Sequence, residues 1–206
     1  ATSMAVIYKD KKSANIMDGS IAVEDNKIIG EDFFKDVKTR LDAFLTPVDH
    51  FKEDKIPVIM SGSYFSFALQ HFVADIYCNG ASLFNGKLGE KIFNENFSVI
   101  FDHDPERRLA ERFFDAEGVV NEGYKSYLVK NGVMRNLLTT KSTAERYGVE
   151  NIGNADASYA GAPSVSANGF DVERGNKALN ELLNGREAIF LDVSSGGDMT
   201  PDGNIG

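Results

Sequence analysis

Apolar residues recur along this chain with two different spacings, and these spacings predict its secondary structure. Short apolar runs between turn residues predict two or three strands within residues 3–30. Helical spacing predicts a helix over residues 31–46. A denser apolar run predicts a second helix over residues 64–77, with Ser61 or Ser63 as its cap and nearly every face buried.

The second half of the chain alternates predicted strands with tight turns. Residues 96–103 form one predicted strand, and residues 123–138 form a hairpin whose Asn131–Gly132 pair favours a type I′ turn. The remaining predicted elements are a strand over 55–60, a helix over 142–147 capped by Ser142, a helix over 176–183 and a buried strand over 187–193. Residues 150–169, rich in small and polar types, predict an extended loop that is mobile or faces a ligand. The pattern as a whole indicates an α+β class dominated by antiparallel strands.

Composition narrows the range of functions and locations. With 42% hydrophobic residues, a chain of 206 residues has enough apolar material for a core. A net charge of −9 argues against direct nucleic-acid binding, which needs clustered Lys and Arg. Cys78 is the single cysteine, so an internal disulfide is impossible. Neither a secretory signal pattern nor an apolar run near the ~20 residues of a membrane span occurs, and we expect a cytoplasmic protein without a membrane partner.

Five glycine-punctuated segments follow one another in a fixed order. They are GASLFNGKLGE (80–90), FFDAEGVV (113–120), LVKNGVM (128–134), STAERYGVENIGNA (142–155) and SSGGDMTPDGNIG (194–206). In this order they resemble the TldD/TldE family, also called PmbA or "modulator of DNA gyrase", over residues 56–206.

The resemblance implies two parts of the chain. Residues 1–54 hold N-terminal strands and an amphipathic helix, which are a remnant of the family's N-terminal domain or a linker. Residues 55–206 are a TldD/PmbA-like C-terminal domain with an incomplete, barrel-like antiparallel sheet and a few packed helices. The final turn has no strand after it to complete a hairpin, so we expect a piece trimmed from a longer chain.

In the active half of that family, a helix carries His-Glu and a second His five residues after the first. Two imidazoles hold zinc, and the glutamate activates water. Counting back from Gly80 places these three positions on Phe65, Ser66 and Gln70, which lack the required chemistry. The chain therefore resembles the TldE/PmbA half. The resemblance implies no catalytic residue and no cofactor in this chain, with zinc expected in a partner subunit.

A different metal site is an alternative on the same predicted helix. His71, Asp75 and Cys78 are spaced by four and three residues, so they would share one helix face, with Asp102 or His103 nearby. A set with one helical histidine is a poor zinc site. The favoured interpretation is that His71 and Asp75 form a hydrogen-bonded pair while Cys78 packs as a small apolar group. His103, in an Asp-rich turn, is expected on the surface.

The resemblance also implies a set of residues that contact a peptide substrate. They are Asp115, Glu117 and Gly118 of an acidic stretch beside the peptide cleft, the pair Gly153 and Asn154, and the pair Gly196 and Gly197. The acidic groups would orient a loop or meet a substrate amine, and Gly118 would let another backbone approach. Glycine-rich edges allow a peptide to add as a strand. The alternative for each segment is a solvated turn.

Together these observations predict a non-catalytic TldE/PmbA-type subunit of a zinc metalloprotease that acts on unfolded or leader peptides. Its partner would be a TldD-like subunit in a homo- or heterodimer. Two alternatives stay open. One is a stand-alone metallopeptidase that uses His71, Asp75 and Cys78 or residues beyond Gly206. The other is a self-associating peptide-binding module without hydrolytic activity.

Overall fold

The computed structural model describes residues 2–9, 15–22, 55–106 and 112–191, with scattered residues between 35 and 46. The chain divides into two compact units, Ala1–Asp54 and Lys55–Gly206, and each is considered by itself. No helix among the described residues combines the length and the hydropathy that crossing a bilayer requires.

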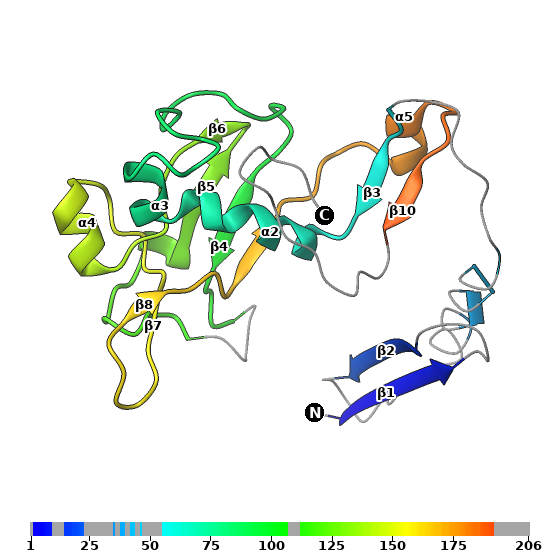
Figure 1. The fold of residues 1–206 in the computed structure, drawn as a ribbon, viewed down its shortest axis with the longest axis horizontal. Coiled ribbons are helices and arrows are strands. Elements are labelled where there is room, and N and C mark those ends of the chain that lie inside the picture. Colours follow the sequence, from blue (N-terminus) through cyan, green and yellow to red (C-terminus); the bar gives the residue numbers. More distant parts are fainter. Residues whose placement is uncertain are drawn as a thin grey trace. The chain divides into compact units, whose positions relative to one another are not determined.

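The first unit contains a hairpin. Strand β1 (Thr2–Lys9) pairs antiparallel with β2 (Asn15–Ala22) (Figure 1). The described residues from Lys35 to Ala43 are helical, and Lys38 forms an i,i+4 ion pair of 2.7 Å with Asp42. Two of the predicted strands are thus present. The residues whose helical spacing predicts this helix lie outside the described residues, namely Phe33, Phe34, Val37, Leu41, Phe44 and Leu45.

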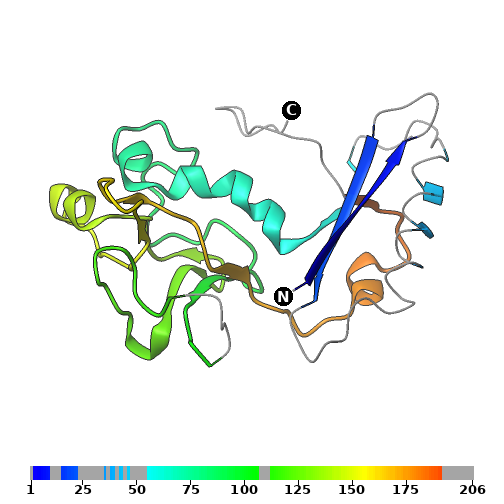
Figure 2. The ribbon, with the colours of Figure 1, turned by 90° about the horizontal axis from the view of Figure 1, so that it is seen from below.

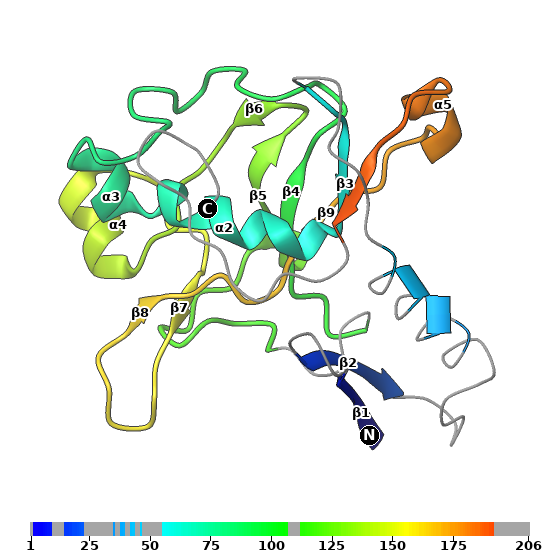
Figure 3. The ribbon, with the colours of Figure 1, turned by 45° about the vertical axis from the view of Figure 1, so that its right-hand side comes forward.

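A four-stranded antiparallel sheet with the order β6-β5-β4-β9 is the centre of the second unit. Its strands are β4 (Val99–Asp102), β5 (Lys125–Lys130), β6 (Val133–Met134) and β9 (Phe170–Val172). Helical segments cross one face of this sheet (Figures 1 and 3), and Figure 2 shows them lengthwise beside it. These segments are the 3-10 turn η1 (Gly62–Phe65), α2 (Ser66–Leu69), the 3-10 turn η2 (Gln70–Phe72) and α3 (Ala74–Cys78).

The hydrophobic core lies between these helices and the sheet. Phe72 packs there with Phe101 and Leu128, and all three side chains are fully buried. Val99 and Phe101 alternate with Ile100 along β4, so one face of this strand supplies the core. Burial of such aromatic and aliphatic side chains contributes about 1.5–3 kcal/mol each.

The predicted helix over 64–77 is interrupted at Val73, which has extended backbone angles (φ −65°, ψ 127°). The segment after β6 forms backbone hydrogen bonds at this break. Leu138 N donates to Phe72 O at 2.8 Å, and Ala74 N donates to Leu138 O at 3.0 Å. Because these bonds replace the helical ones, the backbone groups at the break keep partners. A continuous helix was therefore a wrong prediction.

The predicted hairpin is present as β5 and β6, and its Asn131–Gly132 turn has positive φ at both residues (51° and 77°). Helix α4 (Lys141–Tyr147) follows. Its cap is Thr140, not Ser142, and the Thr140 and Thr143 side chains form a capping box. Gly148 ends the helix in the left-handed conformation.

Residues 150–169, predicted as an extended loop that is mobile or faces a ligand, contain a short hairpin. Strand β7 (Ala155–Asp156) pairs antiparallel with β8 (Ser164–Val165), and Ile152 and Asn154 are buried. Two residues remote in sequence hold this segment: the backbone N–H of Ala116 donates to Ala155 O, and the side-chain amide of Asn121 donates to Ile152 O.

The remaining elements of the described residues are β3 (Val58–Met60), the 3-10 turn η3 (Glu122–Tyr124), the short helix α5 (Leu179–Leu183) and β10 (Ile189–Leu191). Strands β3 and β10 pair in parallel. β10 was expected to be buried, but Phe190 at its centre is 66% exposed. The fold class is nevertheless the predicted one, α+β with mainly antiparallel strands, although the described sheets do not close into a barrel.

Candidate functional site

An open cleft of about 230 Å³ lies between the 112–116 loop and strand β7. Three of the predicted substrate-binding residues meet there, namely Asp115, Gly153 and Asn154. The other residues that line it are His103, Arg112, Phe114, Ala116, Ala155, Asp156, Ser166 and Asn168. The cleft thus combines polar, charged and aromatic groups, as small-molecule and peptide sites do.

Asp115 joins the two walls of the cleft. Its Oδ1 accepts hydrogen bonds from the backbone N–H groups of Glu117 (2.9 Å) and Val119 (2.8 Å). Its Oδ2 accepts one from the N–H of Ala155 in β7 (3.1 Å), and Ala116 N donates to Ala155 O at 2.9 Å. The side chain is buried. Both carboxylate oxygens therefore accept from backbone donors and hold the 115–119 turn against β7.

Glu117 points away from the cleft, toward the start of α4. Its Oε2 accepts from Lys141 N at 2.6 Å, and Lys141 Nζ donates to Glu117 O at 2.6 Å. A carboxylate at this position satisfies an unpaired N–H group and interacts favourably with the helix dipole. In this conformation Glu117 stabilises α4, while its predicted contact with a substrate amine stays a prediction.

The glycines of the predicted set differ in what they do. Gly118 has φ +76°, a conformation that favours glycine, and a Cβ there would meet no atom within 4 Å, so the approach of another backbone to this open side stays a prediction. Gly153 also has positive φ (72°), and a Cβ there would lie 3.2 Å from Asn121 Nδ2. Asn121 Nδ2 in turn donates to Ile152 O at 2.8 Å. Gly196 and Gly197 lie outside the described residues.

Asn154 is the unusual member of the cleft. The residue is only 4% exposed, and its Oδ1 has no hydrogen-bond partner among the described residues. A buried acceptor without a donor costs about 1–3 kcal/mol. Asn154 thus contributes to the wall of the cleft, while this oxygen itself is shielded from solvent.

The three positions that counting back from Gly80 assigns to the family's zinc motif, Phe65, Ser66 and Gln70, lie in η1, α2 and η2. The Phe65 ring packs in an aromatic cluster, with centroid distances of 6.0 Å to Phe72 and Phe93 and 5.3 Å to Phe97. Ser66 and Gln70 are exposed. A phenyl ring, a hydroxyl and an amide do not make a zinc site with a carboxylate base. These residues therefore do not fit the metal.

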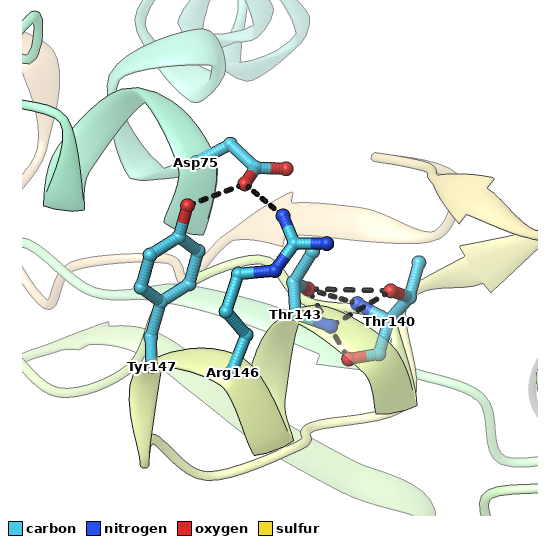
Figure 4. A network of polar contacts seen from close by, with 5 residues as sticks. All are labelled: Asp75, Thr140, Thr143, Arg146 and Tyr147. Atoms are coloured by element: carbon cyan, nitrogen blue, oxygen red, sulfur yellow. Dashed lines mark hydrogen bonds and ion pairs between the residues drawn. The ribbon is translucent and has the colours of Figure 1, made fainter.

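The side chains of the alternative metal site, His71 and Asp75, bond to other residues of the fold and not to each other as predicted. His71 Nδ1 accepts from Leu83 N at 3.3 Å, and the Asp75 carboxylate accepts from Tyr147 Oη at 2.7 Å and Arg146 at 3.3 Å (Figure 4). The break at Val73 also removes the single helix face that grouped His71, Asp75 and Cys78. Cys78 is exposed and does not pack as the predicted small apolar group, and partial desolvation together with nearby Asp75 raises the pKa of its thiol. Within the described part of the chain, no three His, Cys, Asp or Glu side chains are placed to hold one metal ion.

We expect His71 to make the stability of the fold depend on pH. It is buried, its Nε2 has no partner among the described residues, and burial lowers its pKa below the ordinary 6.5. Below pH 6.5 the unfolded imidazole binds a proton that the folded one resists, so the free energy of unfolding should fall as the pH decreases from 6.5. His71→Asn keeps an acceptor near Leu83 N and should flatten this dependence in urea titrations at several pH values. Parallel profiles for the two proteins would contradict this role.

Three features of the cleft were missed by sequence reasoning. His103 was expected on the surface but is half-buried, with its ring stacked on Phe101 at 6.4 Å between centroids. Arg112 and Phe114 were not considered. The paired aromatics before the DAEG turn are the available signal in the sequence, because neighbouring exposed apolar side chains can mark a contact surface.

Comparisons with known proteins agree with this architecture. A metalloprotease of Methanothermobacter thermautotrophicus is 33% identical over 142 residues, 68% of this chain and 31% of that protein. Metalloprotease MJ0996 of Methanocaldococcus jannaschii is 34% identical over 127 residues, 61% of this chain and 28% of that protein. The chain thus spans about a third of the length of these curated relatives.

The fold has also been solved in a similar protein. The crystal structure of TldE from Thermococcus kodakarensis superposes with a TM-score of 0.69 at 21% identity, covering 97% of this chain and 47% of that one. The family model described as PmbA/TldA metallopeptidase C-terminal domain matches residues 53–204. The chain therefore belongs to the PmbA/TldD metallopeptidase family, whose C-terminal domain it carries.

Proposed function

We propose that this chain is a non-catalytic subunit of the TldE/PmbA type, and that it pairs with a TldD-like zinc metalloprotease subunit. In this role it shapes the chamber in which the partner cleaves unfolded or leader peptides. The observation that carries the proposal is the chemistry at the motif positions, where Phe65, Ser66 and Gln70 stand in place of two imidazoles and a carboxylate.

The packing around these positions supports the proposal. Phe65 is part of the aromatic cluster with Phe72, Phe93 and Phe97, so its side chain fills core volume. A histidine in its place would exchange ring contacts for a polar group at the edge of an apolar cluster, which is unfavourable without a partner. The sequence here is therefore adapted to packing. Asp115 and Asn154, meanwhile, build a cleft suited to holding a peptide without cleaving it.

Peptide cleavage by the purified chain, with and without a TldD-like homologue that carries the His-Glu motif, tests this proposal. We expect no cleavage of casein or short peptides by this chain alone, with or without added zinc. We expect chelator-sensitive cleavage when the homologue is present, because the zinc ligands and the general base belong to that subunit.

A matched control identifies the subunit that carries the chemistry. A homologue whose motif glutamate is replaced by glutamine should still co-purify with this chain, but the pair should be inactive. Chelator-sensitive cleavage by this chain alone would overturn the proposal in favour of a stand-alone peptidase. Failure to associate with any TldD-like homologue would instead favour a peptide-binding module that acts without one.

A further inference from the structure

We infer that the tip of the β7–β8 hairpin, residues 157–163, is a contact surface for a second copy of this chain. The two copies meet around a two-fold axis, and Tyr159 of each copy packs on the hairpin tip of the other. This inference goes beyond the proposed function and does not depend on it, because it concerns contacts between identical chains.

Tyr159 is fully exposed at the end of this hairpin. Its relative exposure is 109%, the largest among the exposed large apolar side chains of the described residues. Figures 1 and 3 show the hairpin extending away from the central sheet of the second unit. Tyrosine is one of the residue types that contribute most to binding between proteins, because its ring buries a large apolar area and its hydroxyl group keeps a hydrogen-bond partner.

Hydrogen bonds hold both ends of the hairpin. At its base, Ser166 N donates to Asn154 O at 2.7 Å. At its tip, Gly161 N donates to Ser158 O at 3.0 Å, which closes a turn with Tyr159 at the second position. Because the backbone around Tyr159 is already held, its ring loses less conformational entropy when it contacts a partner.

The tip belongs to a long uncharged stretch. One exposed tyrosine is ordinary on a protein surface. Here, however, residues 157–170 contain no Asp, Glu, Lys, Arg or His, in a chain of which 26% of the residues are charged. Charged residues are depleted at the centres of protein interfaces, and tyrosine among serine and glycine is typical of loops that bind proteins. The lack of Lys and Arg argues against nucleic acid or an anionic membrane as the partner.

The charge of the chain indicates which protein fits the tip. A basic partner would be attracted to the acidic groups of a chain with a net charge of −9. A contact without charged groups instead suits a partner of the same sign, since like charges placed together across an interface are strongly unfavourable. A second copy necessarily has the same sign of charge.

Symmetry makes the same demand on this surface. A two-fold interface brings the same patch of both copies together, so the patch must be complementary to itself. A surface with charges of one sign fails this requirement. The hairpin tip meets it, because its small side chains, one tyrosine ring and serine hydroxyl groups can pack on and hydrogen-bond to their own copies.

Sedimentation velocity of the purified chain over a wide range of concentrations tests the inference. Tyr159→Ser should raise the dissociation constant of the dimer about tenfold or more, as expected for the loss of an aromatic anchor. Phe190→Ser is the matched control at another exposed aromatic residue, in β10, and should leave the constant unchanged. Added salt should tighten the wild-type dimer, because it screens the repulsion between two acidic chains.

A pair of charge variants tests the two-fold contact directly. Ala160 is exposed and adjacent to Tyr159. Ala160→Asp and Ala160→Lys each place like charges on both tips, so each variant alone should be monomeric at concentrations where the wild-type chain is a dimer. An equimolar mixture of the two should form a mixed dimer, because opposite charges then meet. Thermal melting of each variant verifies that it is folded.

Three results would overturn the inference. They are a wild-type chain that is monomeric at every concentration, a dimer that Tyr159→Ser leaves unchanged, and two Ala160 variants that form no mixed dimer. If the wild-type chain is monomeric and Tyr159→Ser weakens co-purification with a TldD-like homologue, the tip contacts that subunit instead. The sedimentation measurements use this chain alone, so their failure is distinguishable from failure of the proposed pairing with a TldD-like subunit.

Discussion

Replacement of Gly132 by Ala is expected to lower the free energy of unfolding by about 3 kcal/mol or more. Gly132 has φ +77°, and a Cβ added there would lie 2.6 Å from the carbonyl oxygen of Asn94, which is backbone. The surrounding bonds prevent relaxation. Gly132 N donates to Phe97 O at 2.8 Å, and its own carbonyl accepts from the N–H groups of Ile92 and Phe93 at 2.9 and 3.0 Å.

Gly148→Ala is the matched control for this substitution. Gly148 also adopts a left-handed conformation, with φ +65°, but a Cβ there meets no atom within 4 Å. Its substitution should therefore cost only the conformational strain, about 1–2 kcal/mol. Urea denaturation of both variants measures the difference, with an unchanged m-value indicating that the unfolded state is the same. Equal losses in the free energy of unfolding would show that the backbone at residues 93 and 94 moves away from the added Cβ at no energetic cost.

The turn at Gly132 also illustrates which parts of the fold are predictable. The Asn131–Gly132 pair encodes its turn locally, because both residues tolerate positive φ and the flanking residues favour strands. The hairpin was therefore predicted correctly from two residues and their neighbours. The end of α4 at Gly148 is local in the same sense. The pair does not encode the hydrogen bonds of Gly132 with residues 92–97, because those residues are distant from the turn in sequence.

The break at Val73 was not predictable, because its cause is distant in sequence. Apolar residues continue through this position at helical spacing, so a single helix was the natural expectation. The backbone bonds of Leu138 to Phe72 and Ala74 cross more than sixty residues of sequence and outweigh local propensity. The metal alternative at His71, Asp75 and Cys78 depended on that helix.

The candidate site was predictable only in part. Resemblance to the family indicated Asp115, Gly153 and Asn154, and the structure places these three in one cleft. The roles within the cleft depend on hydrogen bonds between remote segments, such as Asp115 with Ala155, and composition does not specify them. Residues 150–169 showed the same problem. Their small, polar side chains predicted an extended loop that is mobile or faces a ligand. Contacts with residues 116 and 121 hold the segment around Ile152 in place, and part of it lines the cleft.

Replacement of Asp115 by Ala should have the second large effect, a loss of about 3–5 kcal/mol. Three backbone N–H groups, those of Glu117, Val119 and Ala155, would lose a charged acceptor at once. Hydrogen bonds to charged groups contribute about 1.5–3 kcal/mol each, and bonds that share one acceptor are less than additive. Because Ala155 is buried, water does not readily replace the acceptor there.

Two further variants separate charge from geometry. Asp115→Asn keeps an oxygen for Glu117 and Val119 but turns an N–H₂ group toward Ala155 N, so its loss should be about half that of Asp115→Ala. Asp104→Ala is the matched control, since Asp104 accepts a single bond of 2.9 Å from Glu106 N at an exposed turn, and it should cost less than about 1 kcal/mol.

Amide hydrogen exchange shows which part of the fold the Asp115→Ala substitution destabilises. In Asp115→Ala, the amides of Val119 and Ala155 should exchange faster than those of the β4–β5 ladder, because the turn and β7 separate while the sheet stays formed. Uniform acceleration across the second unit would instead mean that Asp115 stabilises the fold as a whole. In that case the cleft would have no local stability of its own. A peptide site built on it would then persist only as long as the entire domain remains folded.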